Sequence, residues 1–208
     1  MNHFFLISFV VLPLNFLNAQ SLFTRFAALS PPEKCWTLTH PFVAKKAFHA
    51  TTRSRVVTDS IKKSGNIGVD NSGGRMDAFK HAYWIASVSV AIGYRKALKL
   101  GKAHERGNKW QFKKHQLEDQ ELPDSVSSFM DLHNNKQGAT VVKKNKNITL
   151  LELQKKILEL LEQGMLVCIK KDPQGNFLTC EGELIDLNQW RGKWNIPKCS
   201  IASNNEKK

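Results

Sequence analysis

Hydrophobic residues recur every three or four positions over most of this chain, a spacing typical of amphipathic helices. Ser30 to Glu33 predicts a helix start, because the serine can cap the helix while the glutamate reaches back to the cap amide. A second helix is expected over 41–64 and a third from about Arg75 to Ala91. We interpret the glycine-rich loop at 66–74 between them as a connector rather than an anion site, because it lacks a P-loop Lys-Ser/Thr.

The same spacing predicts three more helices. One should run from about Arg95 to Glu105 and close at Gly107, followed by a polar loop or lid over 108–123. Asp124 or Ser125 should cap the next helix, which lasts to about Val142. A capping box at Thr149 opens the last one, a strongly apolar helix that ends at Gly164.

After Gly164 the pattern changes to that of a strand. Residues 165–171 are rich in β-formers, 172–175 predict a turn, and a return strand should begin at 177–178. A tail carrying Trp190 and Trp194 follows, and residues 201–208 should be disordered. The predicted fold is therefore mainly α: a compact multi-helix single domain over 20–200 with a small C-terminal β-hairpin.

The first nineteen residues differ from the rest of the chain. Phe4 to Phe16 is almost wholly apolar, Pro13 interrupts it, and small residues follow at 18–19. The run is too short to span a bilayer, so we interpret residues 1–19 as a signal peptide, with a buried N-terminal segment as the alternative. The mature protein would then be exported to the periplasm or the extracellular space.

Four cysteines are consistent with an oxidising destination. A Cys180–Cys199 pair is favoured, because both residues lie in a short region with little core of its own. We interpret Cys168 and Cys35 as small hydrophobic residues, and the absence of a CxxC motif argues against a zinc ribbon.

The net charge of +13 predicts a surface that attracts anionic substrates or an anionic envelope surface. The Lys doublets are spread along the chain, at 45–46, 62–63, 113–114, 143–144, 155–156 and 170–171. They mark no single groove, so no specific binding of nucleic acid is expected. An apolar fraction of 41% excludes wholesale disorder and fits one globular domain.

Three segments place polar side chains on helix faces that should be buried. They are Asp77 with His81 and Trp84, then His104 with Glu105, then Asp131 with Asn134 and Asn135. One domain seldom buries so many ionisable groups without a use. Taken singly, each residue also fits a structural role, such as a helix-end charge or a hydrogen bond to backbone.

Two kinds of chemistry suit this set. Histidines and carboxylates can hold a divalent metal ion that lowers the pKa of a water molecule. Alternatively, a His-carboxylate pair can act as a general base without metal, with Asn134 or Asn135 donating to an oxyanion. The spacing leaves both open, whereas the absence of HExxH argues against a metalloprotease.

These segments carry three motifs, DAxxHAxW from Asp77, GxAHE from Gly101 and MDLxNN from Met130, preceded by Gly73-Gly74. In their order and spacing the chain resembles a bacterial family known as domain of unknown function 6973, from about Pro31 to Cys199. The resemblance implies a mainly helical exported domain with a polar site, and its distant toxin-associated forms suggest hydrolysis of an envelope component. Lys80 departs from the family pattern, which usually has Arg there.

We therefore expect an exported hydrolase that acts on an anionic or phosphate-containing envelope substrate, with a divalent metal ion as its cofactor. The expected metal ligands are His81, His104 and Asp131, and the expected catalytic residues are Glu105 as general base, Asp77, Asn134 and Asn135. The alternative is a non-enzymatic cationic envelope module in which the same buried polar groups form a structural network. The oligomeric state stays open.

Overall fold

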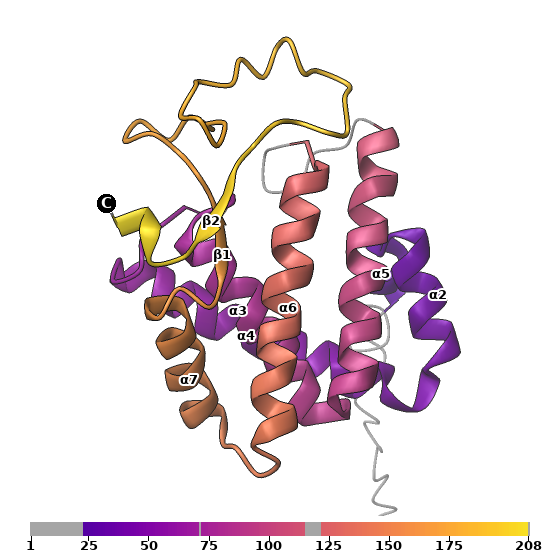
Figure 1. Cartoon of the computed structure of the whole chain (residues 1–208). Helices are drawn as coiled ribbons and strands as arrows, with labels where there is room; N and C mark the ends of the chain where they lie inside the picture. The colour runs from indigo at the N-terminus through magenta and orange to yellow at the C-terminus, as the bar shows by residue number, and fades with distance from the viewer. Residues whose placement is uncertain (1–22, 71, 115–121, 208) are drawn as a thin grey trace, which may run out of the picture.

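The computed structural model of the protein describes residues 23–70, 72–114 and 122–207. The helices are α2 (Pro31–Thr39), α3 (Pro41–Ser64), α4 (Arg75–Ile92), α5 (Tyr94–Lys113), α6 (Ser125–Lys144) and α7 (Leu150–Glu162). The strands β1 (Val167–Ile169) and β2 (Ser200–Ala202) and the short 3-10 helix η1 (Asn205–Lys207) follow. The fold is mainly α with a two-stranded antiparallel hairpin at the C-terminus, as the sequence predicted (Figure 1). The predicted signal peptide lies outside the described residues.

Helix α4 is the central element of the bundle. It packs against α3, α5, α6, α7 and β1, and most of its side chains are buried. On one side Phe79 and Tyr83 meet the apolar face of α7 at Leu153 and Ile157. A helix that is buried all round positions its polar residues inside the protein, so the polar side chains of α4 lie in the interior.

Helix α6 approaches α4 through glycine. A Cβ atom added to Gly138 would lie 2.0 Å from the carbonyl oxygen of Ala82, so the two backbones touch at this point. The contact brings the polar face of α6 against that of α4.

Helix α5 is longer than the sequence predicted. The expected end at Gly107 is wrong, because the helix continues through it to Lys113, so 108–113 are helical and not loop. Gly107 permits close packing instead: a Cβ atom there would lie 2.3 Å from Ser30 Oγ at the start of α2. Of the rest of the predicted lid, residues 115–121 lie outside the described residues.

The C-terminal hairpin is built from different residues than expected. Strand β1 pairs with β2. The predicted return at 177–178 is joined to the end of the 165–171 segment by an isolated bridge between Lys171 and Phe177 and by the Leu178 amide, which donates to the Lys170 carbonyl oxygen at 3.0 Å. The intervening chain loops over the N-terminal end of α6, where the Ser125 amide donates to the carbonyl oxygen of Trp194, before it returns (Figure 1). Backbone pairing with a segment thirty residues away has no local sequence signal, which explains the error.

Where the sequence predicted a disordered tail, residues 201–207 form the end of strand β2, a turn and the 3-10 helix η1. Ser203 is fully buried, and its hydroxyl donates to the carbonyl oxygen of Leu161 at 2.7 Å. The Arg75 guanidinium in turn donates to the carbonyl oxygen of Ser203 at 2.6 Å. These contacts fasten the tail to the start of α4 and the end of α7.

The predicted Cys180–Cys199 disulfide is confirmed, whereas Cys168 is buried and Cys35 is exposed. The disulfide adjoins a buried ion pair in which Lys198 Nζ lies 2.7 Å from Asp124 Oδ2. Asp124 caps α6 by accepting from the amide of Val126, so the returning chain is tied to the start of this helix. Among the described residues, no helix combines the length and hydropathy needed to cross a membrane.

Candidate metal centre

The first two turns of α4 present a carboxylate and an imidazole on one buried face. Asp77 and His81 are four residues apart, and Asp77 Oδ1 lies 3.5 Å from His81 Nε2. The other oxygen of Asp77 accepts from the amide of Gly73 at 2.8 Å, which fixes the carboxylate at the helix N-terminus. Lys80 Nζ lies 2.8 Å from Oδ1, so that oxygen faces both a cation and an imidazole.

Helix α6 supplies the second carboxylate. Asp131 Oδ1 lies 3.4 Å from His81 Nε2. Asp77, His81 and Asp131 are each about 95% buried, and one ligand atom from each lies within 4.8 Å of the others. Two carboxylates and one imidazole thus converge from two helices whose backbones touch.

Burial favours the neutral form of this histidine. Desolvation, aided by the positive charges of Lys80 and His104, holds the pKa of His81 well below its usual value. A neutral imidazole has one nitrogen with an available lone pair, and this is the form that binds metal ions.

The spacing suits a small divalent ion. Ligand atoms about 2.1 Å from a tetrahedral ion are separated by roughly 3.4 Å. The His81–Asp77 and His81–Asp131 distances of 3.5 and 3.4 Å already match this edge. Three protein ligands would leave a fourth position for water or substrate, as in catalytic rather than structural zinc sites.

His104, an expected ligand, is not part of this convergent set. Its Nδ1 lies 3.0 Å from Glu33 Oε1 on α2, and its ring centroid is 6.3 Å from that of His81. The Trp84 ring packs edge-on against His104 at 5.2 Å. His104 is about a quarter exposed, so it lies between the buried centre and the surface.

Glu33, which the sequence predicted only as a helix-capping residue, has a second contact. Its Oε2 does accept from the amide and hydroxyl of Ser30, but Oε1 points to His104. Desolvation raises the pKa of Glu33, yet the His104 and Ser30 contacts outweigh it and lower the pKa to about 2. The sequence did not predict the contact with His104, because the capping-box motif already accounts for a glutamate at this position.

The two asparagines of α6 have different surroundings. Asn134 donates to the carbonyl oxygen of Val167 and accepts from its amide, each at 2.9 Å, so it fastens β1 to α6 and is not available to a substrate. Asn135 is 1% exposed, and neither of its side-chain polar atoms has a hydrogen-bond partner among the described residues. It faces Gly101 of α5, where an added Cβ would lie 3.1 Å from its Nδ2.

Glu105, the expected general base, is buried on the inner face of α5, which packs against both α4 and α6. Its Oε2 accepts from Asn108 Nδ2 at 3.2 Å. The carboxylate therefore belongs to the polar interior of the bundle.

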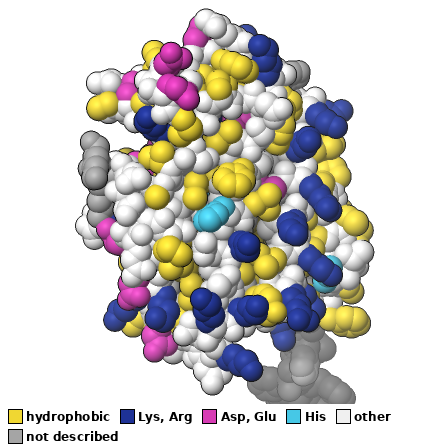
Figure 2. All heavy atoms as spheres, viewed as in Figure 1, with side chains coloured by type: hydrophobic (Ala, Val, Ile, Leu, Met, Phe, Trp, Pro, Cys, Tyr) yellow, Lys and Arg dark blue, Asp and Glu magenta, His cyan; other side chains and the backbone are white. Residues whose placement is uncertain are grey.

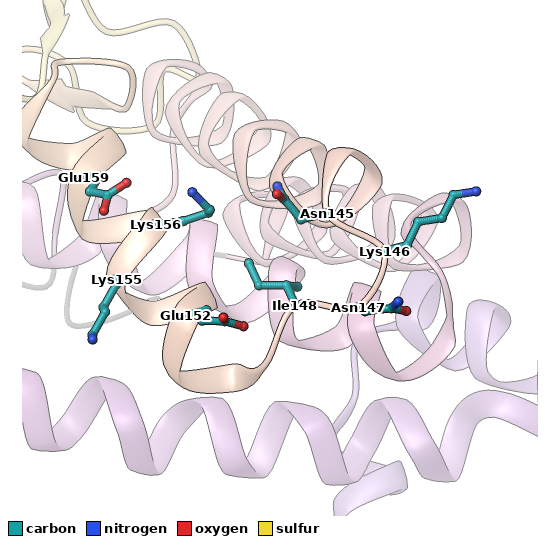
Figure 3. A pocket seen from close by; sticks show the side chains of 8 residues that line it. All are labelled: Asn145, Lys146, Asn147, Ile148, Glu152, Lys155, Lys156 and Glu159. Carbon is teal, nitrogen blue, oxygen red and sulfur yellow. The ribbon is translucent and has the colours of Figure 1, made fainter.

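A separate hollow of about 460 Å³ lies between the α6–α7 connection and α7. None of the predicted site residues lines it. In Figure 3 the Lys155 and Lys156 side chains point to opposite sides of α7 and Lys146 points outward, so these charges do not converge on one ligand.

Comparison with known proteins adds one match. The family described as domain of unknown function DUF6973 matches residues 34–165, more than half of the chain and less than the expected span to Cys199. The match includes Asp77, His81 and Asp131 but not the C-terminal hairpin. No curated protein and no solved structure matches the chain.

Proposed function

Since the chain belongs to the DUF6973 family, whose function is unknown, we propose its activity from the site itself: a metal-assisted hydrolase that acts on an anionic, phosphate-containing substrate. The observation that carries the proposal is the convergence of Asp77, His81 and Asp131 within 4.8 Å in the interior. Two carboxylates and a neutral imidazole are a ligand set typical of divalent ions.

The unsatisfied polar atoms nearby support a functional role over a structural one. A structural network would satisfy its members, whereas His81 Nδ1 and the Asn135 amide have no hydrogen-bond partner among the described residues. Groups of this kind are typical of sites that bind something further.

The ion would polarise a phosphoryl oxygen and activate a water molecule for attack. In the hydrolysis of a phosphate ester, water adds to phosphorus, the ester P–O bond breaks, and the departing alcohol takes up a proton. We assign Glu105 as the acceptor of the proton from water, and Lys80, which is about 30% exposed, as the group that neutralises substrate charge. Asn135 is the donor toward the substrate.

The alternative is a non-enzymatic module in which the same residues only stabilise the fold. Its support is Lys80, whose ammonium group already compensates the charge of Asp77 at 2.8 Å. The two functions differ in their requirement for metal.

Elemental analysis of the purified chain tests the proposal, with about one divalent ion per chain expected. Asp131→Asn preserves shape but removes a charged ligand, so it should lose metal at least about 10-fold while circular dichroism stays unchanged. His133→Ala, a histidine of the same helix that bonds the carbonyl oxygen of Met165, is the matched control and should keep its metal. A folded wild-type chain that takes up no zinc, manganese or calcium would leave the structural module as the better account.

Activity is measured on bis(p-nitrophenyl) phosphate with each metal added. Hydrolysis that is abolished by chelation and by Asp131→Asn is expected. Hydrolysis that resists chelation but requires His81 would instead support metal-free general-base catalysis.

We also propose that the protein acts after export. The Cys180–Cys199 disulfide supports this, because such bonds persist mainly in oxidising compartments. The intact mass of the protein recovered outside the cytoplasm should correspond to cleavage after Ala19, and an uncleaved chain would contradict export by this route.

A further inference from the structure

Helix α5 carries a continuous cationic stripe on its outer face. The stripe consists of Arg95, Lys99, Lys102, Arg106, Lys109 and Lys113, all of which are exposed. Their spacing alternates between four and three residues, which keeps them on one side of the helix. At 1.5 Å per residue the stripe is about 27 Å long.

No acidic side chain offsets the stripe on the helices around it. Helices α2, α5 and α6 lie side by side, and every residue of the three is described. Their acids are Glu33, Glu105 and Asp131, none of which is exposed, and none of the ion pairs among the described residues involves a stripe cation. A single-sign face of this length produces a strong local potential, because no described side chain of these three helices adds an exposed negative charge to it.

The space-filling view shows the same separation of basic and acidic side chains. Dark blue side chains run down the side of the molecule where Figure 1 draws α5, whereas most magenta acidic side chains lie toward the opposite side and the top (Figure 2). Yellow hydrophobic side chains lie among the blue ones on that side (Figure 2).

Exposed apolar residues near the stripe favour a lipid bilayer over other anionic partners. Trp110 lies on α5 beside the stripe and is 36% exposed, and α2, which packs against α5, exposes 69% of Leu38. Phe42, at the start of the following helix, is 95% exposed. Lysine and arginine combined with exposed Trp, Phe and Leu are typical of proteins that lie on a bilayer surface.

The shape of the face also favours a planar partner. A helix that reads DNA must enter a major groove about 12 Å wide. Helix α5 is flanked by α2 and α6, so it presents a broad face rather than a projecting rod (Figure 1).

We propose that the α5 stripe is a docking surface for a bilayer rich in anionic phospholipid. The cations contact headgroup phosphates, and Trp110 inserts at the level of the headgroups. The surface is independent of the buried centre and remains whether or not that centre is catalytic. If it is, docking holds His104, which is about a quarter exposed on the same helix, near the membrane.

The test is sedimentation of the full chain with vesicles of 70% phosphatidylcholine and 30% phosphatidylglycerol. The variant Lys99→Gln, Lys102→Gln, Arg106→Gln, Lys113→Gln removes four exposed stripe cations. The matched control, Lys63→Gln, Lys146→Gln, Lys155→Gln, Lys156→Gln, removes four exposed cations from other elements and has the same net charge. All substituted side chains are exposed, and melting curves verify that both variants fold.

The wild-type chain should bind these vesicles and not pure phosphatidylcholine. At about 1 kcal/mol per basic residue near the surface, removal of four cations can lower partitioning by up to ~1000-fold; the stripe variant should lose at least ~20-fold and the control less than about 3-fold. Equal losses in the two variants would overturn the proposal, because net charge alone would then account for binding.

A second arm replaces vesicles with double-stranded DNA and with heparin. Stripe-dependent binding to either, without sedimentation on the anionic vesicles, would overturn the membrane assignment. Should the fourfold variant unfold, Trp110→Ser supplies an independent readout, because loss of the indole should weaken vesicle binding but leave a purely electrostatic partner unaffected.

Discussion

At the scale of the residue, one oxygen of Asp77 is contacted by two groups that affect metal binding in opposite ways. Lys80 Nζ lies 2.8 Å from it and His81 Nε2 lies 3.5 Å away. The imidazole can share an ion with the carboxylate, whereas the ammonium group competes with the ion for it. Lys80 is therefore the residue that should decide how tightly the proposed centre binds metal.

Lys80→Met should tighten metal binding, because a unit charge a few ångströms from the ion is removed while the three ligands remain. At an effective dielectric constant near 20, two unit charges about 4 Å apart interact by about 4 kcal/mol. Exposure of the lysine reduces its effect strongly, so a gain of roughly 10-fold in affinity is expected. Calorimetric titration with zinc or manganese measures it. Lys136→Met, an exposed lysine of α6, should leave the affinity unchanged. Weaker binding by Lys80→Met would mean that Lys80 positions Asp77 rather than competing with the ion.

The Glu33–His104 contact predicts how stability depends on pH. The pKa of Glu33 is about 2 in the folded protein and near 4.5 when unfolded. Because the folded value is the lower one, the ionised carboxylate stabilises the protein above pH 4.5, and this contribution disappears as the pH falls toward 2.

Glu33→Gln should therefore lower the free energy of unfolding by roughly 2 kcal/mol at pH 7, and the difference from wild type should vanish near pH 2. Urea unfolding at a series of pH values measures it. Glu183→Gln, at an exposed position, is the control and should follow the wild-type curve. A difference that is constant with pH would assign the loss to packing rather than to charge.

At the scale of the element, glycines decide how closely the helices approach. Sequence reasoning treats a glycine inside a helical pattern as a stop or a weakness. Gly107 and Gly138 are neither, since each lies where another element touches the helix backbone. Because the helix was predicted to end at Gly107, the cations on either side of that residue were not recognised as one stripe along α5.

Gly138→Ala should destabilise the protein, although alanine is the better helix former by about 1 kcal/mol. The added Cβ would lie 2.0 Å from the Ala82 carbonyl oxygen, and backbone cannot yield as a side chain can. A loss of about 3 kcal/mol is expected from thermal or urea unfolding.

Gly101→Ala is the matched control for that measurement. Its Cβ would meet only side-chain atoms, at 3.1 Å from Asn135 Nδ2 and 3.2 Å from Ile85 Cδ1. Its effect should stay within about 1 kcal/mol. If Gly138→Ala lowers the free energy of unfolding no more than Gly101→Ala does, α4 and α6 can move apart with little loss of stability.

At the scale of the whole molecule, the C-terminal segment closes the structure around α4 and α6. Strand β2 pairs with β1, and β1 is held to α6 by Asn134. The start of α4 is bonded to the tail through Arg75 and Ser203. The segment therefore braces both helices that carry the proposed metal ligands.

Deletion of residues 200–208 should cost at least about 3 kcal/mol in unfolding free energy, because it removes strand β2 and the buried Ser203. Deletion of 205–208 alone keeps both and should cost clearly less. Chemical unfolding of the two truncated chains measures the difference. Equal stability of the 200–208 deletion and the wild type would mean that β1 holds its place through α6 alone.

The sequence by itself determined the features that depend on neighbouring residues: helix starts at the capping boxes, the mainly helical class, and the pairing of Asp77 with His81 one turn apart. It also indicated Asp131, because the side of a helix that faces inward can be read from its periodicity. Only the tertiary structure decided which of the polar segments meet. His104 contacts Glu33 while His81 meets Asp131, Asn134 pairs with β1, and β1 pairs with a strand thirty residues away. These contacts depend on how closely two backbones approach and on which distant segment packs at an interface. Neither produces a periodic pattern in the sequence.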